Sequence, residues 1–274
     1  MSEAAAARRQ RSFRTDAIIL RRRNFGEADR LLTVLTPGHG RLDLVARGAR
    51  KPASSKTGHV ELYTRSTLQV YRSREPWMVQ QAELRKAWRP LHEDLQCGAW
   101  ASHIAELVER FTIPGDEELR PLFDLLDATF SRLCEEAEPR LVTRHFELEL
   151  LEVGGFRPEL QVCVSGGEVI IAQDQYFSHA GGGVVCPDCA RRGQGQVSLS
   201  LDTLKVLRHL QRSPWEQVRG LSLPETLHND LERIMSGYLT WVLERRLQGM
   251  AFARRVRQLR PVARAGKQGE RRDE

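Results

Sequence analysis

The first 90 residues contain five short segments typical of β-strands, and these segments limit the fold more than any other feature of the chain. Apolar and β-branched residues fill them, and glycine and proline mark the reversals between them, as at 37–40. Five short strands joined by turns predict a small closed barrel of the OB type, an architecture that often binds single-stranded nucleic acid. The predicted strands are 16–23, 30–36, 41–47, 60–72 and 77–84.

This part of the chain is strongly basic, whereas the part that follows it is acidic. Residues 1–90 contain 19 Lys and Arg against 8 Asp and Glu, and residues 91–160 contain 6 against 16. Such a division predicts a polyanionic partner for the basic part; the alternative is a surface kept basic for solubility. The cations that we expect to contact nucleic-acid phosphates are Arg14, Arg21, Arg22, Arg23, Arg41, Arg47, Arg50, Lys51 and Lys56.

Strand geometry limits how these cations can act together. Successive side chains of a strand point to opposite faces, so Arg21 and Arg23 are expected to share a face that Arg22 does not. Aromatic residues of the predicted strands could stack on bases, but aromatic residues in strands are more often part of the core, where we expect these. These aromatic residues are Tyr63, Tyr71 and Trp77.

From residue 91 the apolar residues recur with helical spacing, which predicts an α-helical second part and an α+β fold class. Pro139 and Pro224 are placed to open helices, and Ser200 is placed to cap one. The stretch at about 160–197 has no helical period and is rich in Gly and Cys, so we interpret it as a zinc-knuckle-like insertion. The expected parts are a disordered basic arm at 1–13, an OB-fold DNA-binding domain at 14–85, a helical domain at 86–252 and a flexible Arg-rich tail at 253–274.

The sequence contains no run of about 18 apolar residues, and its first 14 residues lack the apolar core of a secretory signal. We therefore expect a cytoplasmic protein without a membrane partner. Its five cysteines do not form an even set, so they are expected to be free thiols, some of them metal ligands.

Cys186 and Cys189 form a Cys-x-x-Cys unit, a spacing with which two thiolates bind one tetrahedral Zn²⁺. A zinc knuckle usually pairs two such units, but the second unit here would be Cys163 with Gly166 in the place of a cysteine. If zinc binds, the expected ligands are the three cysteines, with His179 or water as the fourth. Because three thiolates leave a position open that a structural site normally closes, partial or absent zinc is the favoured expectation. The alternatives are a vestigial knuckle held without metal by turns and packing, and a redox pair, for which the surrounding βαβ pattern is missing.

Sequence patterns of common enzymes are absent. The β part has no paired carboxylates and no His-x-x-Glu spacing, and the chain has neither a P-loop nor a nucleophile elbow. Glu147, Glu149 and Glu152 are predicted to form the solvated face of a helix. We therefore predict a non-catalytic protein. The alternatives are an RNA-binding or transcription-regulating protein on the same barrel and, less favoured, a metal-dependent nuclease.

Three sequence blocks are more specific than the overall pattern. They are TDAIIL at 15–20, FGEADRLLTVLT at 25–36 and GRLDLVARGARK at 40–51. Further blocks lie at 68–71, 147–158 and 181–189. Together with the order of the parts, these blocks resemble the bacterial RecO family of DNA repair and recombination mediators.

The resemblance implies a protein of the RecFOR pathway that binds single- and double-stranded DNA and anneals complementary strands coated by single-strand binding protein. It also implies loading of recombinase together with RecR, and often RecF, on the DNA of the nucleoid. Zinc is implied by the four-Cys members of the family, from which this chain departs at Gly166, and no nucleotide cofactor is implied. A groove of the helical domain is expected to bind the acidic, Phe-ended tail of single-strand binding protein. The basic candidates for its rim are Arg110, Arg132 and Arg144.

Overall fold

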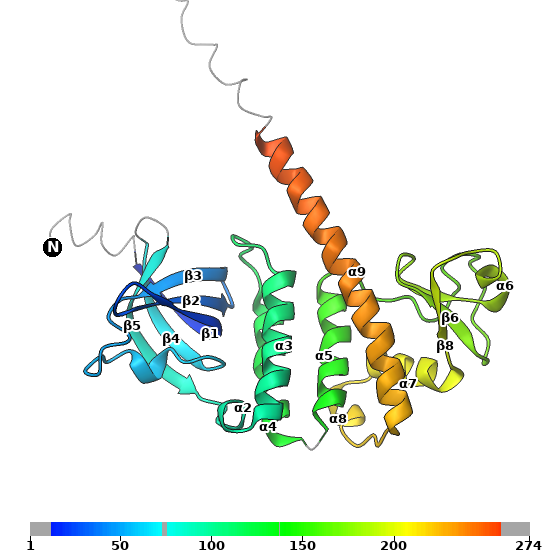
Figure 1. The fold of residues 1–274 in the computed structure, drawn as a ribbon, viewed down its shortest axis with the longest axis horizontal. Coiled ribbons are helices and arrows are strands. Elements are labelled where there is room, and N and C mark those ends of the chain that lie inside the picture. Colours follow the sequence, from blue (N-terminus) through cyan, green and yellow to red (C-terminus); the bar gives the residue numbers. More distant parts are fainter. Residues whose placement is uncertain (1–11, 73–75, 137, 259–274) are drawn as a thin grey trace, which may run out of the picture.

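The computed structural model of the chain describes residues 12–72, 76–136 and 138–258, and of residues 245–258 it describes the backbone alone. A β-barrel, a layer of helices and a small sheet follow one another across the molecule (Figure 1). Most of the predicted N-terminal arm and of the predicted C-terminal tail lies outside the described residues.

The N-terminal strands close into a barrel in the order β1-β2-β3-β5-β4. β3 and β5 pair in parallel, and the other neighbours pair antiparallel, with β4 returning to β1. This topology confirms the predicted five-stranded OB-type barrel and, together with the helices that follow, the α+β class. The strands are β1 (Ser12–Phe25), β2 (Asp29–Thr36), β3 (Gly40–Ala46), β4 (Arg65–Tyr71) and β5 (Trp77–Lys86).

Strand alternation gives β1 and β2 two buried faces. Ile19 and Leu32 point into the barrel and belong to its own apolar core. Ile18, Leu20 and Leu35 point outward and are part of the core of the helical layer. One outer face of the barrel is therefore buried against the helices.

The predicted strand at 60–72 is shorter in the structure, where β4 begins only at Arg65. A short 3₁₀ helix, η1 (Thr57–His59), precedes it. Tyr63 has a positive φ of 50°, and the hydroxyl of Thr64 donates to the carbonyl of Glu61 at 2.8 Å. This side-chain bond favours a turn over an extended strand, although β-branched and aromatic residues favour a strand by propensity.

The helical layer is built around α5, which packs against α3, α4, α7 and α9. Phe123 and Phe130 of α4 and Phe146 of α5 are fully buried in the shared core. Pro139 lies in the first turn of α5, and the hydroxyl of Ser200 accepts from the backbone N–H of Thr203 at 3.2 Å, as the sequence predicts. The helices are α2 (Pro90–Glu93), α3 (Leu95–Phe111), α4 (Arg120–Glu135), α5 (Pro139–Val153), α6 (Pro187–Ala190), α7 (Leu201–Arg212), α8 (Trp215–Val218) and α9 (Glu225–Gln258).

The segment that the sequence analysis interprets as an insertion forms a three-stranded sheet in the order β7-β6-β8. Phe177 of β6 packs edge-on against Tyr238 of α9, with 5.5 Å between ring centroids, so the sheet is anchored to the helical layer. Its strands are β6 (Gln175–Ser178), β7 (Gly183–Val185) and β8 (Gln196–Leu199).

The last helix is longer than the sequence analysis expects. The predicted tail starts at 253, but α9 continues to Gln258 and extends past the other helices in Figure 1. Residues 251–258 contain neither glycine nor proline, so nothing in their backbone stops the helix. Within the part of the chain that the structure describes, no helix has the length and apolar character needed to cross a membrane.

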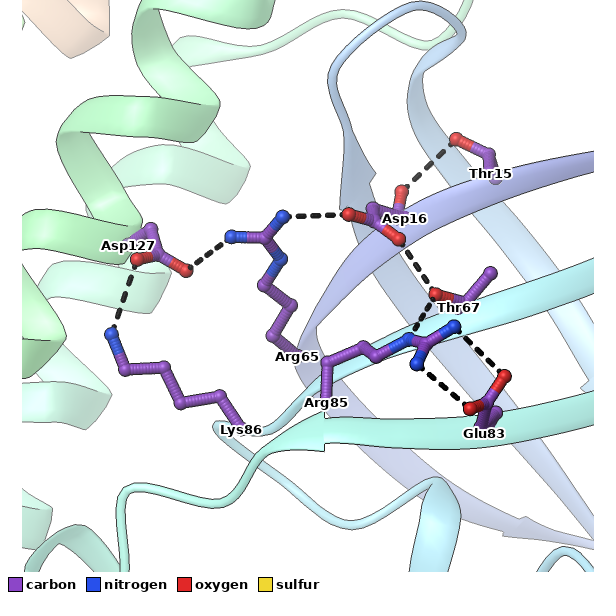
Figure 2. Close-up of polar contacts among 8 residues, drawn as sticks. All are labelled: Thr15, Asp16, Arg65, Thr67, Glu83, Arg85, Lys86 and Asp127. Carbon is purple, nitrogen blue, oxygen red and sulfur yellow. Dashed lines mark hydrogen bonds and ion pairs between the residues drawn. The ribbon is translucent and has the colours of Figure 1, made fainter.

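A polar network joins the barrel to α4 (Figure 2). The guanidinium of Arg65 in β4 bonds Asp16 of β1 at 2.6 Å and Asp127 of α4 at 3.2 Å. Lys86 of β5 also reaches Asp127, at 3.3 Å, and Thr67 donates to Asp16 at 2.7 Å. Asp127 therefore links two barrel strands to the helical layer.

We expect Asp127→Ala to lower the free energy of unfolding by about 1–2 kcal/mol, because the partly buried Arg65 and the exposed Lys86 lose their shared partner. Glu83→Ala is the matched control, since Glu83 bonds the exposed Arg14 and Arg85 within the barrel alone. That change is expected to cost less than about 0.5 kcal/mol. Urea unfolding followed by circular dichroism measures both, and equal losses would contradict the role given to Asp127.

Candidate nucleic-acid interface and metal centre

The turn between β1 and β2 and the loop after β3 form one edge of the barrel. The backbone N–H of Arg50 donates to the carbonyl of Ala28 at 2.9 Å, and that of Gly48 donates to the Asp29 carboxylate at 2.8 Å. Gly48 has a φ of +66°, a conformation that glycine adopts without strain. These bonds hold the loop against the turn, so cations from separate parts of the sequence share one edge.

Five of the predicted cations lie on this edge, which we call the basic edge. Arg23, Arg47 and Lys51 are exposed, and their side chains form no hydrogen bond or ion pair with any described residue. Arg50 donates to the carbonyl of Glu27 at 3.1 Å, and Lys56 donates to the carbonyl of Arg47 at 3.2 Å. Three cations of the edge are thus free to meet an anion, while the other two also brace the loop.

Arg21 and Arg41 lie instead where the barrel meets α3. Arg21 forms an ion pair with the carboxylate of Glu109 at 3.0 Å, and Arg41 donates to the backbone carbonyl of the same residue. The last carbonyls of a helix have no partner within the helix and carry partial negative charge. Both arginines therefore fix β1 and β3 to the C-terminal end of α3.

Arg22 of β1 is the cross-strand partner of Leu32 in β2, and Leu32 belongs to the apolar core of the barrel. Its guanidinium forms an ion pair with Glu61, and Arg30 bonds the same carboxylate at 2.7 Å. Burial lowers the pKa of Arg22 and of Arg30, and the neighbouring charge of Arg30 lowers that of Arg22 further. Because Arg21 and Arg23 are exposed, the face separation of the three arginines is as the sequence predicts.

Arg14 is exposed on the outer side of β1 and bonds Glu83 of β5 at 3.1 Å. Trp77 packs edge-on against Phe13 at 5.9 Å, and Tyr63 packs in the same way against Phe130 at 5.7 Å. Both residues are half-buried and packed against another ring, which favours packing over base stacking for these two side chains.

Phe25 is an aromatic residue that the sequence analysis does not single out. It ends β1 next to the basic edge, and its side chain is 49% exposed. A large apolar ring left in water among cations is a feature of surfaces that stack nucleic-acid bases. The sequence signal that could have found it is its position, two residues after the run Arg21–Arg23 and directly before the turn glycine, Gly26.

The three candidate cations of the acidic part have partners of their own. Arg110 forms an ion pair with Glu106 at 2.6 Å, and Arg132 lies over the ring of Trp215 at 5.2 Å. Arg144 is buried, with its guanidinium 3.1 Å from the carboxylate of Glu147.

The sequence predicts that Glu147 lies on a solvated face with Glu149 and Glu152, and for Glu147 this prediction is wrong. Its side chain is only 1% exposed, and its second oxygen lies 2.9 Å from Nε2 of His103 in α3. Glu149 and Glu152 are substantially exposed, as expected.

Cys163, Cys186 and Cys189 meet beside the small sheet, and Glu168 joins them. One ligand atom from each residue lies within 4.8 Å of those of the other three. The thiol of Cys163 accepts from the backbone N–H groups of Gly166 at 3.3 Å and Cys186 at 3.4 Å. Burial alone raises the pKa of Cys163, but these bonds outweigh it and lower the pKa to about 7.

This donor set fits Zn²⁺, which binds thiolates and carboxylate oxygens in a tetrahedral arrangement. His179, the suggested fourth ligand, is not in the group. Its ring faces Phe177 at 5.6 Å and packs against Gly237 of α9, where an added Cβ would lie within 2.6 Å of the imidazole Nε2. Three of the predicted ligands are thus brought together, and a carboxylate stands with them.

Comparison with known proteins gives consistent results over most of the chain. The family model described as Recombination protein O N terminal matches residues 10–88, and the model described as Recombination protein O C terminal matches residues 92–251. A protein of Roseiflexus sp. named DNA repair protein RecO is 38% identical over 251 residues, which are 92% of this chain and 88% of that protein. Proteins of the same name from Pelotomaculum thermopropionicum and Dehalococcoides mccartyi are 35% and 33% identical, and the matches cover 90% and 85% of this chain and 95% and 91% of those proteins.

Proposed function

Because the chain belongs to the RecO family of DNA repair proteins, we propose that the basic edge of its barrel binds DNA and promotes the pairing of complementary strands. The observation that supports this most directly is a group of exposed cations on an OB-type barrel, Arg23, Arg47 and Lys51, whose side chains have no partner within the described part of the chain. Phosphate contacts by such cations release counterions from the nucleic acid, which drives binding at moderate salt.

Annealing of this kind makes and breaks no covalent bond. It requires two polyanions to be held close together while their bases remain free to pair. Cations on the barrel edge lower the repulsion between two strands, and the acidic residues 91–160 repel phosphates from their part of the helical layer. The proposed role is therefore non-catalytic, and DNA binding is centred on the barrel.

The proposed partners are single- and double-stranded DNA, the tail of single-strand binding protein, RecR and RecF. These follow from membership of the family. Arg144 is not proposed at the rim of the pocket for the tail, because it is buried and its charge is balanced by Glu147.

The deciding experiment measures the annealing of complementary oligonucleotides coated by the cognate single-strand binding protein. We expect the protein to accelerate duplex formation and to leave the strands at full length when Mg²⁺ is present. Shortened strands would support a nuclease instead. Competition between single-stranded DNA and RNA of the same sequence tests the remaining alternative, and a clear preference for RNA would overturn the proposal.

We expect Phe25→Ala to weaken single-strand binding by about 5- to 150-fold, the cost of one lost base-stacking contact. The dependence of affinity on salt should not change, because no charge is removed. Tyr176→Ala provides a control, since Tyr176 is 38% exposed but lies in the small sheet. Fluorescence anisotropy with a labelled oligonucleotide measures both variants, and wild-type affinity in Phe25→Ala would remove the ring from the interface.

A further inference from the structure

The four clustered donor groups come from two short segments held in place by backbone bonds. The backbone N–H of Cys163 donates to the carbonyl of Glu168 at 2.8 Å, and that of Gly167 donates to the carbonyl of Cys163 at 2.8 Å. This closed turn directs the side chains of Cys163 and Glu168 toward Cys186 and Cys189, which flank the start of α6. The turn depends on Gly167, whose φ is +82°.

The carboxylate of Glu168 occupies the place that a side chain at position 166 would take. A Cβ atom built on Gly166 would lie 2.7 Å from the carboxyl carbon of Glu168, and closer still to one of its oxygens. Position 166 is where the second cysteine of a Cys-x-x-Cys unit beginning at Cys163 would stand. The glycine therefore leaves a space at the ligand position, and the carboxylate fills it.

The surroundings of Glu168 do not offer another reason for this position. Its carboxylate forms no ion pair or hydrogen bond with a described residue, although Arg191 and Arg192 line the same pocket. Arg191 is paired with Asp188. An exposed carboxylate that lies with three sulfur atoms rather than with nearby guanidinium groups is placed as a ligand would be.

We propose that Glu168 is the fourth ligand of a Zn²⁺ site formed with Cys163, Cys186 and Cys189, in place of the missing cysteine. Three thiolates and one carboxylate carry the same charge as four thiolates, so the exchange keeps the net charge of the site. Zinc at ordinary bond lengths needs ligand atoms about 3.3–3.8 Å apart, and the four donor atoms all lie within 4.8 Å of one another. The exchange also closes the open position that three thiolates alone would leave.

The test compares Glu168→Gln with Asp188→Asn in otherwise unchanged full-length protein. Asp188 lies between Cys186 and Cys189 but is not among the clustered donors, so it controls for the loss of one negative charge. We expect wild-type protein purified under reducing conditions to contain about one zinc per chain by elemental analysis. Glu168→Gln should weaken zinc binding about 100-fold in a chelator competition, because one of four ligands is lost, whereas Asp188→Asn should bind as the wild type does.

A second variant keeps the proposal testable if Glu168→Gln folds poorly. In Gly166→Cys/Glu168→Ala the carboxylate is removed, which leaves space for the thiol of the new cysteine. The φ of Gly166 is not in the left-handed region, so a cysteine can adopt this backbone conformation. This variant should regain tight binding, and Co²⁺ in the site should show stronger thiolate-to-metal absorption than in the wild type, since four sulfur ligands replace three. The proposal is overturned if wild-type protein binds no zinc, if Glu168→Gln retains it, or if His179→Ala releases it while Glu168→Gln does not.

Discussion

Replacing Arg23, Arg47 and Lys51 together by Ala is expected to weaken single-strand DNA binding by about 500-fold at 50 mM salt and about 30-fold at 200 mM. Each phosphate contact to a single strand contributes about 0.7 to the slope of log affinity against log salt, so three lost contacts lower that slope by about 2. Arg50 and Lys56 are left in place because their side chains also donate to backbone carbonyls that hold the loop.

The matched control removes three positive charges from the helical part instead of from the basic edge. Arg110, Arg157 and Arg219 are similarly exposed, and each forms an ion pair with a glutamate of the helical part. Their joint replacement by Ala should leave the salt slope unchanged and affect affinity only through the net charge. Anisotropy titrations at several salt concentrations measure the slope of log affinity against log salt for both variants. Equal slopes in the two variants would show that the basic edge makes no phosphate contacts.

The barrel is the part of the fold that the sequence predicts best. Its strands are short and locally patterned, and turn residues at 37–40 and near Gly26 punctuate them. The exception, the late start of β4, depends on a hydroxyl of Thr64 that bonds the carbonyl of Glu61. Such a local side-chain bond competes with strand propensity and is invisible to a pattern of apolar residues.

The candidate basic edge is only partly visible in the sequence, because an arginine does not reveal its partner. Arg21 is in the same basic run as Arg23, and Arg41 lies in the same basic part of the chain, yet the side chains of Arg21 and Arg41 both bond Glu109, far away along the chain. The exposed cations can be separated from the paired ones only when the position of α3 is known. The sequence does not reveal Glu168 as a ligand for a related reason, since metal-site spacing rules are written for cysteine and histidine and not for a carboxylate two residues beyond the missing cysteine.

The environment of α5 explains why Glu147 is buried although helical spacing predicts a solvated face for it. Helical spacing predicts one apolar stripe and one polar face, which suits a helix at the surface. α5 is instead surrounded by α3, α4, α7 and α9. Only part of α5, near its C-terminal end, still faces water, so Arg144 and Glu147 on its covered sides are buried and must satisfy each other.

The largest loss of stability is therefore expected from Glu147→Ala. The change leaves the guanidinium of Arg144, which is 5% exposed, without its carboxylate, and His103 loses the same partner. Removing one member of a buried ion pair costs about 3–5 kcal/mol in the free energy of unfolding, because the remaining charge stays desolvated. Glu152→Ala on the same helix should cost less than about 1 kcal/mol, since Glu152 is half exposed and pairs with the exposed Arg157.

A double variant separates the unpaired charge from the lost packing. In Arg144→Met/Glu147→Leu both charges are gone and much of the side-chain volume is kept, so most of the lost stability should return, as it does when a buried pair is replaced by apolar residues. Chemical unfolding of the wild type and the three variants measures these differences. If Glu147→Ala costs no more than Glu152→Ala, the Arg144–Glu147 pair is hydrated in solution. If the double variant is as unstable as Glu147→Ala, packing around α5, rather than the uncompensated guanidinium, sets the cost.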